Sequence, residues 1–242
     1  MKMETIKVCI DPVDGGRTHT EETHLRRSLR LLVGGGALAT ALLGTAVPAQ
    51  AFAAPIVLSA GHVDVVDVAY EDGVLELGLH DESVEPDVER DPDDVVLLVK
   101  RAARTTVPDN PSFSFLGGAG ARVWVLPEIQ NEELLWPGLS AEEIEDGVFT
   151  GDAVTAKVEK VTGPGRLAVW TEDAVGTPHV LVNSGDGLPD ALSLAAGAHQ
   201  HASWGFQKAG VYLIKVRATA TLAATGDTVT SEPAVYKVVV QP

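Results

Sequence analysis

Two alternating runs of apolar and polar residues meet at a tight turn in VDVVDVAYEDGVLELGLH, residues 63–80. Val63 to Tyr70 and Val74 to His80 have the period of two that places successive side chains on opposite faces of a β-strand. The Asp72-Gly73 pair between them is typical of a two-residue hairpin turn. We therefore expect an antiparallel hairpin here.

The same period of two continues through most of the chain. Further apolar or alternating runs lie at 95–100, 121–126, 153–161, 166–171, 178–183, 211–223 and 234–240. The sequence Gly163-Pro-Gly165 predicts a second hairpin between two of these runs, and Thr225-Gly-Asp227 predicts a turn. Many short strands with frequent turn signals indicate an all-β fold, which we predict to be an Ig-like antiparallel β-sandwich.

One segment breaks this period. Residues 128–146 begin with EIQNEELLW and continue through Pro137-Gly138 to Ser140-Ala-Glu-Glu143. Ser140 followed three residues later by Glu143 matches the capping box, in which each side chain satisfies a backbone N–H at the start of a helix. We therefore predict a short helical insertion at about 128–146.

The first part of the chain is typical of an export signal. A basic patch at 24–30 is followed by an apolar run at 31–47 and by small residues suited to cleavage at 48–54. We predict a signal peptide at 25–53, used by the Sec or the twin-arginine route, and an exported domain at 54–242. A transmembrane anchor is the alternative, but the apolar run is short for about 30 Å of hydrocarbon. The polar residues 1–24 are interpreted as a non-native extension from a start codon placed too early.

Charge and cysteine usage exclude several classes of partner. The chain has 18 Lys and Arg against 34 Asp and Glu, a net charge of −16, so we expect it to bind neither nucleic acid nor anionic lipid. Its one cysteine, Cys9, precedes the predicted cleavage site, so the exported domain has no disulfide and no thiolate ligand. Val238–Pro242 offers no apolar span, and no transmembrane helix is expected in the exported chain. The acidic stretch 81–94 predicts a solvated loop, with a calcium site as the alternative.

The histidines provide the sharpest local pattern. His199-Gln200-His201 places two imidazoles at positions i and i+2, which point the same way in an extended segment. His62 and Asp64 repeat this spacing with an imidazole and a carboxylate. If loops at one end of a sandwich bring the two pairs together, three imidazoles and an oxygen ligand would suit zinc, manganese or copper(II). The alternative is that these histidines lie in loops and donate hydrogen bonds to backbone carbonyls.

Catalytic motifs are absent from the sequence. It contains no Gly-x-Ser-x-Gly elbow, no His-Glu-x-x-His pair and no phosphate-binding Gly-x-x-x-x-Gly-Lys loop. Acidic residues are too numerous for any pair to single out a glycosidase site. We therefore do not expect an enzyme.

Several longer motifs carry a family resemblance. They are Ser59-Ala-Gly-His-Val-Asp64, Val123-Trp-Val-Leu-Pro127, Leu135-Trp-Pro-Gly-Leu-Ser140, Asn183-Ser-Gly-Asp-Gly187 and Gly197-Ala-His-Gln-His-Ala-Ser-Trp-Gly-Phe206. With these motifs the chain resembles the actinobacterial surface-anchored protein family, also described as choice-of-anchor M domain proteins. The resemblance implies an exported β-rich domain, often tethered to the cell envelope and associated with an ABC transporter that takes up manganese or zinc.

The resemblance also implies a set of ligands and a function. It points to His62, His199 and His201, with Asp64 as an oxygen ligand, and we add His179 from a neighbouring loop as a further candidate. The expected function is capture or buffering of a divalent metal outside the membrane, with transporter components or the cell wall as partners. The alternative is a structural or adhesive surface domain in which the histidines have no metal.

Overall fold

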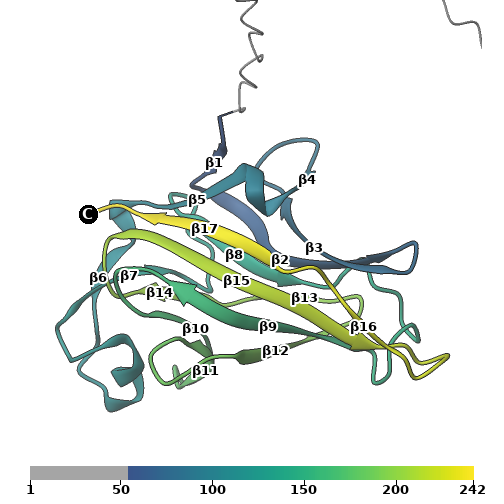
Figure 1. Ribbon diagram of the computed structural model, residues 1–242. Helices are drawn as coiled ribbons and strands as arrows, with labels where there is room; N and C mark the ends of the chain where they lie inside the picture. The colour runs from purple at the N-terminus through teal and green to yellow at the C-terminus, as the bar shows by residue number, and fades with distance from the viewer. Residues whose placement is uncertain (1–53) are drawn as a thin grey trace, which may run out of the picture. The chain divides into compact units, whose positions relative to one another are not determined.

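The computed structural model describes residues 54–242. The predicted N-terminal extension, the signal peptide and Cys9 lie outside the described residues. The described chain is built almost entirely of strands, which confirms the all-β sandwich prediction (Figure 1). None of the helical turns in this part is long and apolar enough to cross a lipid bilayer.

Sheet A is the largest of three sheets. It contains, in spatial order, β1 (Ile56–Leu58), β5 (Val95–Val99), β17 (Ala234–Val240), β15 (Gly210–Thr221), β9 (Ala153–Thr162) and β12 (Asp190–Ala195), with β16 (Thr228–Thr230) beside β15. The side chains of β15 alternate strictly between core and solvent. One face of this sheet is therefore buried, and the other is solvated.

Sheets B and C are smaller, with five strands each. Sheet B contains β13 (His199–His201), β8 (Leu135–Ser140), β2 (Gly61–Glu71), β3 (Val74–Asp81) and β4 (Val88–Arg90), in that order. Sheet C contains β11 (Pro178–Asn183), β10 (Leu167–Glu172), β14 (Ser203–Phe206), β7 (Arg122–Leu126) and β6 (Arg104–Thr106). Three short 3₁₀ turns complete the described elements: η1 (Pro92–Asp94), η2 (Arg101–Ala103) and η3 (Pro111–Leu116).

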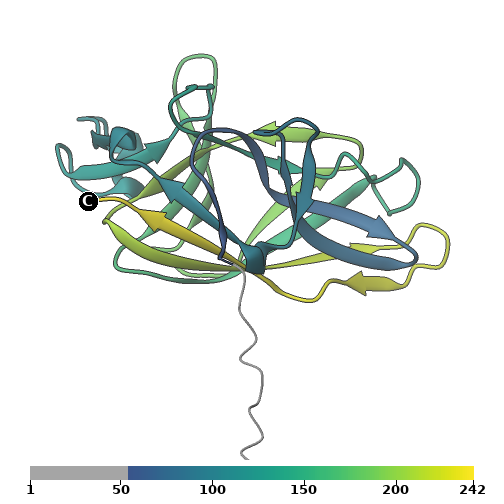
Figure 2. The same cartoon turned by 90° about the horizontal axis from the view of Figure 1, so that it is seen from above.

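One hydrophobic core joins the three sheets. The chain passes from sheet B to sheet C through a single residue, Ala202, between β13 and β14, and Figure 2 shows sheet A on one side of the molecule with strands of the other sheets facing it. The core contains side chains from all three sheets, among them Ile214, Tyr236, Val63, Leu139, Leu167 and Phe206. Most strand pairs are antiparallel, but β1–β5, β5–β17 and β2–β8 are parallel.

The hairpin predicted at residues 63–80 is formed by β2 and β3. Asp72 and Gly73 have φ values of 49° and 85°, as the two central residues of a type I′ turn require. A bulge in β2 shifts its register, so that Asp64 is opposite His80 and Asp67 is opposite Gly78. Because His80 and Gly78 share a face of β3, the bulge places Asp64 and Asp67 on one face of sheet B despite their odd spacing.

The predicted helical insertion at 128–146 is wrong. Leu135–Ser140 forms strand β8, which lies between β2 and β13, and the surrounding residues form turns. The Ser140 hydroxyl accepts a hydrogen bond from the backbone N–H of Glu142 at 3.2 Å, which closes a turn and starts no helix. Pro137, which has no backbone N–H, also disfavours a helix through this segment.

Two further expectations are corrected. The runs around Gly163-Pro-Gly165 form strands β9 and β10, but these belong to sheets A and C and do not pair as a hairpin. The linker instead crosses the end of the sandwich against the Tyr212 ring, which a Cβ at Gly163 would overlap. The stretch 81–94 is not only loop, because it contains β4 and η1 and begins with the fully buried Asp81, which pairs with Arg90 at 2.7 Å.

Candidate metal centre

The polar face of sheet B brings the two predicted pairs together. On β2, His62 and Asp64 lie opposite Trp136 and Gly138 of the parallel strand β8. On the other side of β8, His201 of β13 also lies opposite Gly138. Asp64, Gly138 and His201 therefore form one row across three strands, with His62 and His199 beside it. The predicted pairs meet on the face of a sheet rather than at a rim of loops.

Gly138 leaves the space in which these groups converge. A Cβ at this position would overlap the Oδ1 atom of Asp64 and would lie 3.0 Å from its Cγ atom and 3.4 Å from Nε2 of His62. Any larger residue at position 138 would therefore displace the side chains of Asp64 and His62, which extend over Gly138 from β2. A glycine at the centre of a strand is often a place where other groups approach the backbone closely.

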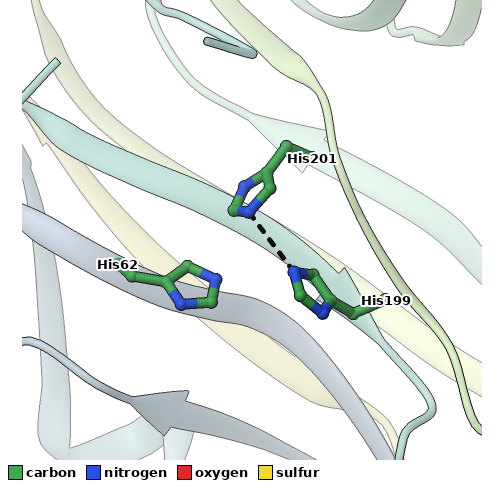
Figure 3. A group of neighbouring side chains, drawn as sticks. All are labelled: His62, His199 and His201. Carbon is green, nitrogen blue, oxygen red and sulfur yellow. Dashed lines mark hydrogen bonds between the residues drawn. The ribbon is translucent and has the colours of Figure 1, made fainter. Parts of the chain in front are cut away.

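The three imidazoles point toward one another, as Figure 3 shows. One ring nitrogen from each of His62, His199 and His201 lies within 4.8 Å of the others. The Nε2 atoms of His199 and His201 are 3.4 Å apart, and Nε2 of His62 is 3.3 Å from Oδ1 of Asp64. Asp64 also belongs to close groups with His62 and Glu82 and with His199 and Glu142.

The outer nitrogen of each ring has an oxygen acceptor. Nδ1 of His201 lies 3.1 Å from the carbonyl oxygen of Pro137, which can only accept a hydrogen bond. Nδ1 of His62 is 3.0 Å from Glu82, and Nδ1 of His199 is 3.3 Å from Glu142. In the neutral His201 ring the hydrogen bond to Pro137 places the proton on Nδ1 and the lone pair on Nε2, toward the centre, whereas Glu82 and Glu142 lie at ion-pair distance from Nδ1 of His62 and His199. This is the arrangement of metal-ligating histidines whose second nitrogen is fixed by a carboxylate or a carbonyl.

Asp64 is a buried carboxylate without a hydrogen-bond partner. Its side chain has 0% exposure, and neither of its oxygens has a partner among the described residues. Burial raises the pKa of Asp64, and the positive charge that His62 and His199 can carry opposes this rise. Nε2 of His62 is likewise buried and unpartnered. Buried polar groups are usually satisfied, so these atoms indicate a missing partner at the point where they meet.

Two separations between candidate ligand atoms match the edge of a tetrahedral site. Bonds of about 2.0–2.1 Å from zinc to nitrogen or oxygen give an edge of about 3.3–3.4 Å between two ligands of a tetrahedron. The observed separations of 3.4 Å between His199 and His201 and 3.3 Å between His62 and Asp64 match this edge. The three imidazoles form one close group that could hold a divalent transition metal, and Asp64 lies next to that group through its contact with His62.

Trp136 forms a wall of the site. Its ring stacks on His201, with centroids 3.6 Å apart and planes inclined by 5°, and it lies 5.1 Å from His62. The indole N–H donates to the carbonyl oxygen of Glu128 at 2.8 Å, which fixes the ring. Burial lowers the pKa of His201, a change that the Pro137 carbonyl opposes, so the ring favours the neutral form that binds metal.

The structure does not bring His179 to this cluster. It lies on β11 in sheet C, opposite Thr171, and is exposed. Sequence reasoning also missed four residues that shape the site: Glu82, Trp136, Gly138 and Glu142. The interpretation of residues 128–146 as a helix hid Trp136, Gly138 and Glu142, whereas no local pattern connects Glu82 with His62. In β8 every residue except Trp136 is buried, so its burial does not alternate and gives no simple strand signal.

Comparison with family models, with curated proteins and with solved structures finds no match to this chain.

Proposed function

We propose that this chain is an exported metal-binding module that captures zinc through His62, His199, His201 and Asp64. The observation that carries the proposal is the close group of one ring nitrogen each from His62, His199 and His201, beside the buried Asp64 carboxylate, which has no hydrogen-bond partner among the described residues. In the metal-free chain the Nε2 atoms of His199 and His201 lie 3.4 Å apart and share a hydrogen bond whose donor depends on the tautomer of each ring. A divalent cation would take the place of that proton and supply the missing partner of Asp64.

Zinc is the metal that the ligand set favours. Imidazole nitrogens suit zinc and copper, whereas manganese prefers sites richer in carboxylate, carbonyl and water oxygens. Copper(II) prefers a square-planar or tetragonal arrangement, whereas the two separations of 3.4 and 3.3 Å match a tetrahedral edge. The affinity for zinc should therefore be compared with the affinities for manganese and copper(II).

The position of the site supports capture and release of the ion. Two of the four ligands come from β13, a three-residue strand at the edge of sheet B, and His199 is exposed. A partner could reach the ion from this edge without opening the core. Together with the resemblance to the surface-anchored family, this position supports delivery to a metal-type ABC transporter at the cell envelope.

Isothermal titration of the metal-free chain, purified without a histidine tag, tests the metal site. We expect one zinc per chain, bound more tightly than manganese, and a loss of at least about 100-fold in affinity when His199 and His201 are both changed to alanine. The matched control is His179→Ala, which should leave zinc binding unchanged. Equal heats in the double variant and the native chain would remove these residues from the site and leave the structural surface domain as the function.

The transport link has its own test. We expect the zinc-loaded chain to give up its metal to the solute-binding protein of a zinc-type ABC transporter faster than to the same concentration of buffer chelator. Equal rates would leave a metal-binding module without a transport role.

A further inference from the structure

A second polar feature lies on sheet B beside the free edge of β3. It is a cavity of about 630 Å³, and its lining includes Asp67 from β2, Glu76 from β3, Glu89 from β4, and Glu143 and Glu232 from neighbouring turns. Arg90 is the only basic side chain among the described residues that line it. The Arg90 guanidinium is already paired with Asp81 at 2.7 Å. No other basic side chain of the described residues lines the cavity, and beside it His80 lies 3.4 Å from Glu89, so the carboxylates outnumber the positive charges near them.

Asp67 turns this acidic cavity into a candidate binding site. Its side chain is only 2% exposed, yet its Oδ1 atom has no hydrogen-bond partner among residues 54–242. The β2 bulge holds Asp67 on the polar face, and the Ser140 hydroxyl hydrogen-bonds to its carboxylate. Burial raises the pKa of Asp67, and burial together with the charge of Asp67 raises the pKa of Glu89 to about 7. Burial is the largest cause of both shifts, and His80, whose Nδ1 atom lies 3.4 Å from Glu89, opposes them only in part.

The spacing of these carboxylates does not suit a single metal ion. The only close groups of possible ligands among the described residues are those around His62, Asp64 and His199, and none of them contains Asp67, Glu76 or Glu89. Calcium needs six to eight oxygens at about 2.3–2.6 Å, which one buried carboxylate with distant neighbours cannot supply. A longer ligand with several cationic groups can reach carboxylates that stand apart.

The edge of β3 offers further acceptors. β4 pairs with β3 only from Leu79 to Asp81, so among the described residues Val74–Leu77 pair with β2 on one side and with no strand on the other. Backbone carbonyls on such an open edge can accept hydrogen bonds from an added group or strand.

We propose that this cavity binds an organic polycation, with one ammonium or guanidinium group on Asp67 and others on the carboxylates of Glu76, Glu89 and Glu143. Charge-assisted hydrogen bonds from such groups would satisfy Oδ1 of Asp67 and neutralise the cavity. The ligand is either a free polyamine or a peptide segment rich in Lys or Arg, since both carry this chemistry. This cation site is separate from the metal centre, so an experiment can refute one of the two binding proposals without refuting the other.

Titration of the full chain with spermidine and with a tri-lysine peptide tests the proposal, in buffer at about 0.15 M salt to screen non-specific attraction. We expect saturable binding of at least one of them, weakened at least tenfold in Asp67→Asn and weakened in Glu89→Gln. The control Glu132→Gln removes an exposed acid that does not line the cavity and should bind as the native chain does. Zinc affinity should stay within threefold in all three variants.

The results of this experiment distinguish a polyamine from a peptide ligand and show when the proposal is wrong. A peptide that binds more tightly than spermidine identifies a strand-like partner on the β3 edge, and the reverse identifies a free polyamine. Equal binding by Asp67→Asn and the native chain overturns the proposal, as does displacement of spermidine by an equal concentration of calcium. Asp67→Asn removes a buried unpartnered charge, so the variant should fold, and its circular dichroism spectrum checks this.

Discussion

Asp64 is the residue whose environment most strongly requires a cation. Its carboxylate is fully buried with both oxygens unpartnered, and burial raises its pKa. An acid whose pKa is higher in the folded than in the unfolded chain destabilises the folded state above the unfolded pKa, because folding must retain a charge that water would solvate better. In the metal-free chain at neutral pH, Asp64 therefore costs stability that the ion restores.

This cost predicts that one substitution at Asp64 has opposite effects on the stability of the metal-free and the zinc-bound chain. Asp64→Asn should stabilise the metal-free chain by about 1–3 kcal/mol at pH 7, since a buried charge is replaced by a neutral group of the same shape. In excess zinc the same variant should be less stable than the native chain, because it lacks the oxygen ligand. Urea denaturation with and without zinc measures both. A variant that is destabilised in both conditions would show that Asp64 is held by interactions other than a metal.

Gly138 makes a separate prediction at the same scale. Gly138→Ala places a Cβ against Asp64 and His62, so it should lower zinc affinity by about 10- to 100-fold and destabilise the chain by about 1–3 kcal/mol. The matched control is Gly118→Ala, whose Cβ would meet nothing within 4 Å. Calorimetry and thermal unfolding measure the two effects. If Gly138→Ala binds zinc as well as Gly118→Ala does, the space above Gly138 is not part of the site.

The four proposed ligands could be found from sequence because their spacing is local. Residues at i and i+2 share a face in any strand, so His62 with Asp64 and His199 with His201 were predictable without a topology. Glu82 and Glu142 were not, because each reaches its imidazole across strand pairings that no local pattern specifies. His179 was added on an assumed proximity of loops, and the topology places it in a different sheet.

At the scale of elements, β8 decides whether the pairs can meet. Its capping-box motif suggested a helix, and a helix would have left β2 and β13 without the strand between them. The strands themselves were predictable from their period of two, but their partners were not. The runs on either side of Gly163-Pro-Gly165 show this, since both are strands and yet they pair in different sheets. Pairing depends on packing between distant segments, which sequence spacing does not record.

β13 yields a prediction about dynamics. This strand has three residues and pairs only with β8, so it should open more readily than the strands of sheet A. A zinc ion bound as proposed would join the two imidazoles of β13 to β2, and opening β13 would then break the site. With free zinc at about 100 times its dissociation constant, opening should cost about 2.7 kcal/mol more, which slows amide exchange at 199–201 about 100-fold. Hydrogen exchange read by mass spectrometry measures this.

Exchange in β15 provides the internal reference for that experiment. β15 is a twelve-residue strand paired on both sides and carries none of the proposed ligands. Its exchange through local opening should change little on zinc addition. Equal protection of β13 and β15 would mean that zinc acts only by raising global stability, and unchanged exchange in β13 would place the ion elsewhere.

At the scale of the whole molecule, the groups with shifted pKa values fall into two sets, which change the stability of the fold with pH in opposite directions. Burial raises the pKa values of Asp64, Asp67 and Glu89, the last to about 7. Burial alone would lower the pKa of His80, but its hydrogen bond to Asp87 and nearby carboxylates outweigh this and raise it. The folded metal-free chain therefore holds more protons than the unfolded chain between about pH 4 and 7, and it loses stability as the pH rises. Four lowered pKa values act in the opposite direction: those of Asp81, Glu159 and Asp173 act mainly near and below about pH 4, and that of His201 acts at higher pH.

The metal-free and zinc-bound chains should consequently have opposite pH profiles. The metal-free melting temperature should be higher near pH 5 than near pH 8, and the net charge of −16 acts in the same direction because protonation reduces self-repulsion. Zinc needs neutral imidazoles and an ionised Asp64, so the increase in melting temperature on adding zinc should be small at pH 5 and grow as the pH rises through about 6.5. Differential scanning calorimetry in both states measures the profiles, and the His199→Ala, His201→Ala double variant should lose the zinc-dependent increase at every pH. A zinc-dependent increase as large at pH 5 as at pH 8 would mean that the ion is held by ligands other than these imidazoles.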